Sequence, residues 1–191
     1  MSRVTFKLMG ENLFLIEFEH SWEKSRVLEG RPWVFERNIF SVANFDGITP
    51  PETIEFEKVA FWVCVNNLPL ACMSKEIGNQ IGSTVGYVKE VETDEDGVGW
   101  GKFLHVKIHV DLTKPLARGR HLNIQGKTVW ILFQYERILR FCFHCKVVLH
   151  GKNGCLKRAS AMVHGDETEY GLWLRVPPPR CQTRMEDACR T

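Results

Sequence analysis

The sequence predicts an α+β fold, in which antiparallel strands and a few short helices form a sheet-based body. Three observations support this class. Apolar and polar residues alternate over several short runs, which is typical of strands with one buried face. Two other runs carry apolar residues at helical spacing, and Gly, Asn and Pro interrupt the chain between runs. The 191 residues, 44% hydrophobic and 25% charged, suffice for a buried core in one or two domains.

A first unit is expected over residues 1–48, followed by a proline-containing linker at 46–51. Its expected elements, in order, are a strand at 4–9, a buried strand at 12–18, a helix at 21–30 and a strand at 33–45. The first two strands are expected to pair as a hairpin across residues 10–12. Ser21 is a residue type that caps helix N-termini and Gly30 is typical of a helix end, so the helix is placed between them.

A second unit is expected over residues 55–135. Its most apolar run, 59–65, predicts a central strand that ends before Pro69. Ile77 and Ile81 stand at helical spacing and predict a short helix. The expected elements after the central strand are this helix at 74–81, strands at 85–92 and 103–112, and a hairpin of 121–124 with 128–135.

Four potential metal ligands follow this unit. Cys142, Cys145, His150 and Cys155 have the spacing C-x2-C-x4-H-x4-C, which is the ligand spacing of a zinc knuckle. Three thiolates and one imidazole can close a tetrahedral shell around Zn²⁺. The alternative is that these cysteines are small buried hydrophobic residues, but 7 Cys and 7 His in 191 residues rarely reach this spacing by chance. The sequence therefore predicts a zinc site within residues 138–158.

Two positions of the motif differ from the common knuckle, in which a glycine follows the second cysteine and another precedes the histidine. The tight loop favours residues that tolerate positive φ at these positions. Here Lys146 and Leu149 occupy them, and the glycines are Gly151 and Gly154. A left-handed conformation costs a non-glycine residue roughly 1–2 kcal/mol, whereas structural zinc contributes roughly 10–16 kcal/mol. We therefore expect zinc binding to persist with weaker affinity.

The charge around the motif is typical of a nucleic-acid-binding segment. Residues 101–191 contain 16 Lys and Arg against 7 Asp and Glu, whereas residues 1–100 contain 9 against 16. Residues 137–158 contain six basic residues and no acidic residue, so this segment is expected to attract phosphate. The residues expected to contact phosphate are Arg140, Lys146, Lys152, Lys157 and Arg158. Phe143, more than Phe141, is expected to stack on unpaired bases; the alternative for both rings is a small core around the metal loop.

Other features bear on compartment and chemistry. No run of about 18 apolar residues exists, so a membrane span is not expected. Seven cysteines, three of them assigned to metal, predict a reducing, intracellular compartment and do not distinguish nucleus from cytoplasm. His105, His109 and Asp111 alternate along one expected strand; we interpret them as an exposed face rather than a metal site. No nucleophile and base stand at motif spacing, so neither an enzyme nor a small-molecule substrate is predicted.

Several runs together resemble one family. They are GENLFLIEF at 10–18, RVLEGRPW at 26–33, FWVCVNNLP at 61–69, IGNQIG at 77–82, YERILRFC at 135–142 and YGLWLR at 170–175. In this order they are similar to plant retrotransposon-derived proteins that join a domain of unknown function to a zinc knuckle. Those proteins are related to the first open reading frame of LINE-type elements or to gag-like proteins. The resemblance covers about residues 8–180 and implies packaging or chaperoning of RNA without enzymatic activity.

The resemblance also implies a ferredoxin-like or RRM-like body. Family members usually carry a further strand and helix before the hairpin at 10–18, so the first unit is expected to be an N-terminally truncated layer with an unpaired sheet edge. After the knuckle, residues 176–191 are rich in proline and arginine and are expected to form a flexible basic tail.

The predicted function is zinc-dependent, sequence-tolerant binding of single-stranded RNA or DNA. The alternative is a protein-interaction or self-association module in which the zinc loop is only a structural clip. The basic segment around the motif favours nucleic acid, because a structural clip does not require it. A zinc hydrolase needs an open coordination position, which four protein ligands do not leave.

Overall fold

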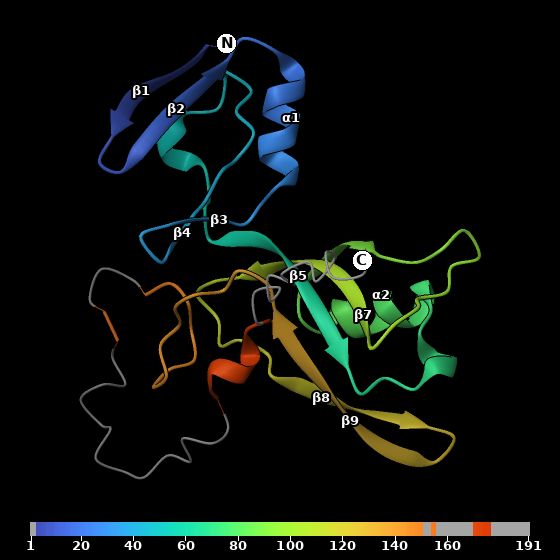
Figure 1. The fold of residues 1–191 in the computed structure, drawn as a ribbon. Helices are drawn as coiled ribbons and strands as arrows, with labels where there is room; N and C mark the ends of the chain where they lie inside the picture. Colours follow the sequence, from blue (N-terminus) through green and yellow to red (C-terminus); the bar gives the residue numbers. More distant parts are fainter. Residues whose placement is uncertain (1–2, 151–153, 156–169, 177–191) are drawn as a thin grey trace, which may run out of the picture.

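The computed structural model describes residues 3–150, 154–155 and 170–176 and has the predicted α+β fold (Figure 1). The strands are β1 (Val4–Gly10), β2 (Leu13–Phe18), β3 (Trp33–Phe35), β4 (Asn38–Phe40), β5 (Lys58–Asn66), β6 (Tyr87–Val91), β7 (Phe103–Asp111), β8 (Gly119–Ile124) and β9 (Lys127–Tyr135). The helices are α1 (Ser21–Glu29) and α2 (Lys75–Ser83), with short 3-10 turns η1 (Pro51–Thr53), η2 (Leu70–Cys72) and η4 (Leu172–Leu174). None of the helices in these described ranges is long and apolar enough to cross a membrane.

The predicted N-terminal hairpin is confirmed, but its strands are not buried. β1 and β2 pair antiparallel in a sheet of their own. Phe6 and Leu8 on β1 are 65% and 71% exposed, and Phe14 on β2 is 47% exposed. The expectation of a buried strand at 12–18 is therefore wrong. Its physical reason is that a two-stranded sheet offers only one neighbouring strand, so apolar composition alone does not bury it.

Two local details of the N-terminal elements differ from expectation. The N-cap of α1 is His20, so Ser21 is the first helical residue and not the cap, whereas Gly30 ends the helix as predicted. The single strand expected at 33–45 is a short hairpin of β3 and β4. Glu36 and Arg37 form its two-residue turn at φ values of +48° and +64°. Such turns usually carry Asn or Gly at these positions, so the residue types found here do not indicate a turn.

The largest sheet has five antiparallel strands in the order β6-β7-β5-β9-β8, which places the predicted central strand, β5, in the middle. β5, α2 and β6 are consecutive in the chain, and β7 lies between the two strands. This is the split β-α-β arrangement of ferredoxin-like folds. This arrangement occurs within residues 58–135 rather than in the first unit. In chain order, β8 takes the place that a second helix has in a full β-α-β-β-α-β layer.

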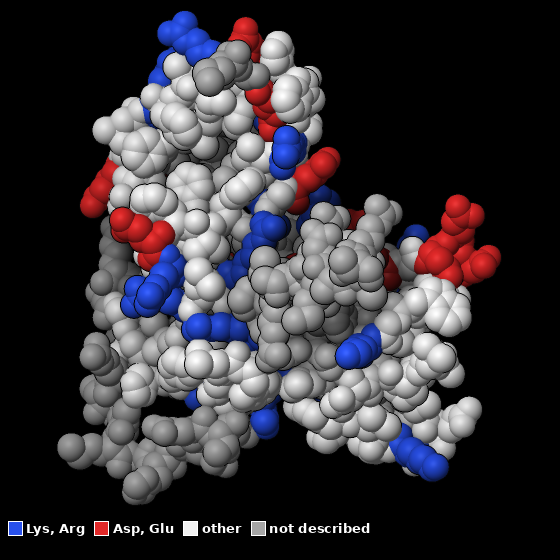
Figure 2. Space-filling view, in the orientation of Figure 1, with Lys and Arg blue, Asp and Glu red and all other residues white. Residues whose placement is uncertain are grey.

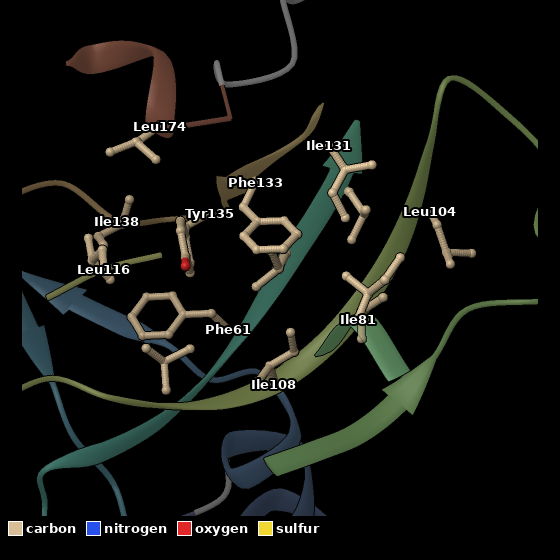
Figure 3. Packing of buried hydrophobic residues seen from close by; sticks show 14 of the residues in the cluster. Phe61, Ile81, Leu104, Ile108, Leu116, Ile131, Phe133, Tyr135, Ile138 and Leu174 are labelled. Atoms are coloured by element: carbon tan, nitrogen blue, oxygen red, sulfur yellow. The ribbon is translucent and has the colours of Figure 1, made fainter. Parts of the chain in front are cut away.

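One face of this sheet carries the core and is covered by α2 (Figures 1 and 3). Alternate residues of β5, β7 and β9 point into it, with α2 contributing Ile81. The most fully buried members of this cluster include Phe61, Val63, Val65, Leu104, Val106, Ile108, Ile131, Phe133 and Tyr135. Gly78 and Gly82 let α2 approach closely, because a Cβ at either would lie 2.6 Å from a valine methyl of β6.

The opposite face of the sheet is more polar and meets the N-terminal elements. Trp62 on β5 stacks on the ring of His105 on β7 at a centroid distance of 4.3 Å. Lys107 on β7 is buried, and its Nζ donates to the carbonyl of Glu29 at the end of α1 at 3.2 Å. Arg137 donates to the carbonyl of Gly30 at 2.9 Å. Side-chain hydrogen bonds to the end of α1 thus connect this helix to the five-stranded sheet.

Candidate metal centre

The segment that leads from β9 to the predicted ligands is anchored in the core. After Tyr135, the N–H of Glu136 donates to the carbonyl of Trp62 at 3.0 Å. Ile138 and Phe141 then place their side chains in the buried cluster. Cys142 follows Phe141 directly, so the backbone of the first ligand is held in place beside the sheet.

A tight turn brings the first two cysteines together. The N–H of Cys142 donates to the carbonyl of Val147 at 2.8 Å, and the N–H of Lys146 donates to the carbonyl of Cys142 at 2.7 Å. Lys146 has a φ of +68°, the left-handed conformation expected for the residue after the second cysteine. Leu149 is not among the described residues with positive φ, so the expectation holds at only one of the two positions.

Backbone hydrogen bonds fix the turn to the segment after β7. The N–H of Leu116 donates to the carbonyl of Lys146 at 2.9 Å, and the N–H groups of Val148 and Leu149 both donate to the carbonyl of Leu112, at 3.2 and 2.8 Å. Reasoning from the ligand spacing alone missed this support. It places His150 immediately after an anchored residue and so limits where its imidazole can lie.

The four predicted ligand atoms meet in space. The three Sγ atoms and the imidazole nitrogen of Cys142, Cys145, His150 and Cys155 all lie within 4.8 Å of one another, and each residue is half-buried. The Sγ atoms of Cys142 and Cys155 are 3.6 Å apart, and Cys145 Sγ lies 3.0 Å from His150 Nε2. A tetrahedral zinc ion with ordinary bond lengths separates two sulfurs by about 3.8 Å and sulfur from nitrogen by about 3.5 Å. The donor set therefore fits Zn²⁺ with small adjustments.

The two thiols of the turn differ in acidity. Burial opposes ionisation of Cys142, but hydrogen bonds from the N–H groups of Cys145 and His144 outweigh it and lower its pKa to about 6. Burial raises the pKa of Cys145, and the neighbouring thiols of Cys142 and Cys155 raise it further. Cys142 is therefore more ready than Cys145 to bind metal at neutral pH, and the charge of a bound ion would favour ionisation of Cys145.

The two phenylalanines that flank the first ligand have different environments. Phe141 is 7% exposed and belongs to the buried cluster, whereas Phe143 is 47% exposed. Their ring centroids are 4.8 Å apart. Phe141 is thus a core residue, as the alternative interpretation held, and the side chain of Phe143 remains accessible to a ligand.

The predicted phosphate-contacting residues are only partly within the described ranges. Arg140 is exposed just before the turn. Lys146 is half-buried, with its Nζ 4.8 Å from the ring centroid of Tyr170 and hydrogen-bonded to the carbonyl of Phe143. Lys152, Lys157 and Arg158 lie outside the described residues, as does the predicted tail from residue 177 onward.

His105, His109 and Asp111 lie on one face of β7, as predicted, but this face is half-buried rather than exposed. The three side chains do not converge on one point. His105 contacts Glu92 and Glu136, while the ring of His109 lies 6.0 Å from that of Tyr87. Asp111 accepts hydrogen bonds from Thr113 and forms an ion pair with Lys114. These three residues therefore do not form a shared metal site.

Comparison with known families agrees with this geometry. The zinc knuckle family model matches residues 110–157. The chain carries a CCHC zinc knuckle. The matched segment begins at the end of β7, so it contains Leu112 and Leu116, the residues whose backbone holds the knuckle turn. Knuckle and supporting segment thus lie within one family match.

A relative from a plant also matches the chain. An uncharacterized protein of Arabidopsis thaliana is 24% identical to it over 107 residues, which are 56% of this chain. The match covers 34% of that relative, so the chain corresponds to about a third of its length. No solved structure gives a significant match to the chain.

Proposed function

We propose that the chain binds single-stranded RNA or DNA through its zinc knuckle, with little sequence preference and without enzymatic activity. The observation that carries this proposal is the exposed ring of Phe143 on a metal-binding turn. Bases of any sequence have a face that stacks on an aromatic ring, and this contact is worth roughly 1–3 kcal/mol per base. Proteins use such rings together with cations that track the phosphate backbone.

Basic side chains near the knuckle supply the second part of this mode of binding. Arg137 and Arg140 are exposed on the segment that enters the knuckle. Figure 2 shows Lys and Arg side chains gathered where the N-terminal elements meet the five-stranded sheet. Contacts between such cations and phosphates release counterions, so binding should weaken steeply with salt.

The proposal extends to the origin and location of the chain. Its ordered runs resemble plant retrotransposon-derived proteins, and we infer that the chain derives from such an element. Cys64, Cys72 and the three knuckle cysteines are free in the described residues, as expected of an intracellular protein. The four knuckle ligands would fill a tetrahedral shell, which supports a structural rather than a catalytic ion.

The deciding experiment measures zinc content and single-stranded RNA affinity as a function of salt, in the native chain and in Cys145→Ser. We expect one knuckle zinc to be lost from the variant and RNA affinity to fall with it. Cys72→Ser, a half-buried free cysteine outside the knuckle, is the matched control and should change neither. An RNA affinity that is independent of both zinc and salt would refute the proposal.

Self-association is a second candidate function, favoured by the exposed apolar residues of the N-terminal hairpin. Phe6 and Leu8 on β1 are largely exposed, and within the described residues β1 pairs only with β2. Such an edge can pair with a second copy. Sedimentation velocity over a range of concentrations tests this. Leu8→Lys should shift the chain towards monomer, and a native chain that stays monomeric at all concentrations would exclude the role.

A further inference from the structure

A second group of metal-binding side chains lies on the five-stranded sheet, away from the knuckle. Cys64 on β5 is directly opposite His105 on β7, and Glu136 follows the last residue of β9. Side chains of directly opposed residues share a face and have Cβ atoms about 5 Å apart. The Sγ of Cys64, a ring nitrogen of His105 and a carboxylate oxygen of Glu136 lie within 4.8 Å of one another.

The imidazole of His105 is held in a position suited to a metal ligand. Its Nε2 lies 3.0 Å from Glu136 Oε1, on the side of the cluster, and its Nδ1 lies 2.6 Å from Glu92 Oε2. The ring also stacks on Trp62 with an interplanar angle of 24°. A carboxylate that accepts a hydrogen bond from the non-ligating nitrogen is the usual means by which proteins orient a metal-bound histidine.

The distances and access fit an ion with one sulfur, one nitrogen and one oxygen ligand. Zinc-type bond lengths place a nitrogen and an oxygen ligand about 3.3 Å apart, close to the observed 3.0 Å between His105 and Glu136. Cys64 is 1% exposed, whereas the side chains of His105 and Glu136 are 19% and 32% exposed. An ion can therefore approach from the side of His105 and Glu136, and three ligands leave one position for water.

The competing occupant of this cluster is a proton. Without a metal, the thiol of Cys64 keeps its proton, because burial and the charges of Glu136 and Glu92 raise its pKa to about 12. A divalent ion carries more positive charge than a proton, so it can offset the negative charges of a thiolate and a carboxylate together. Its binding would release the proton of Cys64.

We propose that Cys64, His105 and Glu136 bind a second divalent transition-metal ion, of the zinc class, and that Glu92 orients His105 through its Nδ1. Mixed sulfur, nitrogen and oxygen ligands favour Zn²⁺ or Co²⁺ over Mg²⁺ or Ca²⁺, which prefer oxygen alone. This site is independent of the knuckle and of nucleic-acid binding.

Counting metal ions in the full chain tests the proposal. The purified chain is loaded with excess Zn²⁺, freed of weakly held metal and measured by mass spectrometry of the element. We expect two zinc ions per native chain, one in Cys142→Ser/Cys145→Ser and one in Cys64→Ser. The triple variant should hold none, and Cys72→Ser should hold two. A native ratio of one, or a ratio unaffected by Cys64→Ser, overturns the second site.

Cobalt spectra and further variants keep the test decisive if Cys64→Ser folds poorly. In the background of Cys142→Ser/Cys145→Ser, Co²⁺ should give a thiolate charge-transfer band from Cys64. His105→Gln and Glu136→Gln, whose side chains are partly exposed, should each remove this band and one zinc ion while the circular dichroism stays native. A proton-only cluster predicts no such band in the background variant, and that result also overturns the proposal.

Discussion

The N–H of Lys146 donates a hydrogen bond to the carbonyl of Cys142 at 2.7 Å, and Lys146 has a φ of +68° in this turn. The same turn brings the Sγ of Cys145 towards those of Cys142 and Cys155. Metal binding by the knuckle therefore depends on a backbone conformation that is unfavourable for lysine. Among the described residues of the knuckle (142–150, 154 and 155), Lys146 is the one non-glycine residue with a positive φ.

Lys146→Gly should strengthen zinc binding. Removing the left-handed strain is worth roughly 1–2 kcal/mol, and the lost contact of Lys146 with the Tyr170 ring costs about 0.5–1 kcal/mol. The net gain of about 1 kcal/mol corresponds to roughly a fivefold higher affinity. Competition with a zinc chelator measures it. Leu149→Gly is the control and should not tighten binding, because Leu149 has no positive φ to relieve; equal gains in both variants would contradict this account.

Phe143→Ala should weaken binding of single-stranded RNA without loss of zinc. Loss of one stacked base costs roughly 1–3 kcal/mol, which is roughly a 5- to 150-fold lower affinity. Fluorescence anisotropy at fixed salt measures the change. Phe35→Ala on β3 removes an aromatic ring that is even more exposed than Phe143 and lies far along the chain from the knuckle, and it should leave affinity unchanged. Similar losses in both variants would show that Phe143 has no special role.

Arg140→Ala should reduce the salt dependence of RNA binding rather than remove the interaction. Each phosphate contact with a single strand contributes about 0.7 to the slope of log affinity against log salt, so the slope should fall by about that amount. RNA titrations at several salt concentrations measure this slope. Lys24→Ala on α1 removes an exposed charge from the acidic half of the chain and should keep the native slope. An unchanged slope for Arg140→Ala would place this residue outside the interface.

Sequence patterns predicted elements that depend on local signals. The apolar run of β5 and the ligand spacing of the knuckle each specify their own structure, and both are found as predicted. The hairpin of β3 and β4 was missed because Glu36 and Arg37 adopt positive φ without the residue types that favour it.

Features that depend on strand pairing could not be predicted from local sequence patterns. Cys64 and His105 are 41 positions apart in the chain and meet only through the register of β5 with β7. Glu136 joins them because β9 pairs with the other side of β5. Similarly, Phe141 and Phe143 are two positions apart, so alternation would place both rings on one face. Phe143 instead lies in the turn from Cys142 to Lys146 and is exposed, whereas Phe141 is buried.

Gly78→Ala should destabilise the fold although alanine favours helices. A Cβ at this position would lie 2.6 Å from Val91 Cγ1 and 3.0 Å from Leu104 Cδ2. Overpacking of this kind costs about 1–3 kcal/mol, which exceeds the gain of about 1 kcal/mol in helix propensity. Urea unfolding should therefore show a net loss. Gln80→Ala, on the exposed side of α2, should be neutral or stabilising; a stabilised Gly78→Ala would mean that α2 can move away from β6.

His109 should make stability depend on pH. Burial lowers its pKa below the ordinary 6.5, and the charges of Arg31, Lys89 and Lys107 lower it further. The unfolded chain therefore binds a proton that the folded chain does not in the window between the lowered pKa and 6.5. Stability contributed by the neutral ring is present above pH 6.5 and is lost as pH falls through this window.

His109→Gln should remove this part of the pH dependence. Between about pH 7.5 and about pH 5.5, urea unfolding should show a smaller loss of stability in the variant than in the native chain, because glutamine has no proton to gain. Tyr87→Phe, which changes the neighbouring ring 6.0 Å away but keeps the imidazole, should retain the native slope. Parallel curves for the native chain and His109→Gln would mean that the folded protein accepts the proton on His109 as readily as the unfolded chain does.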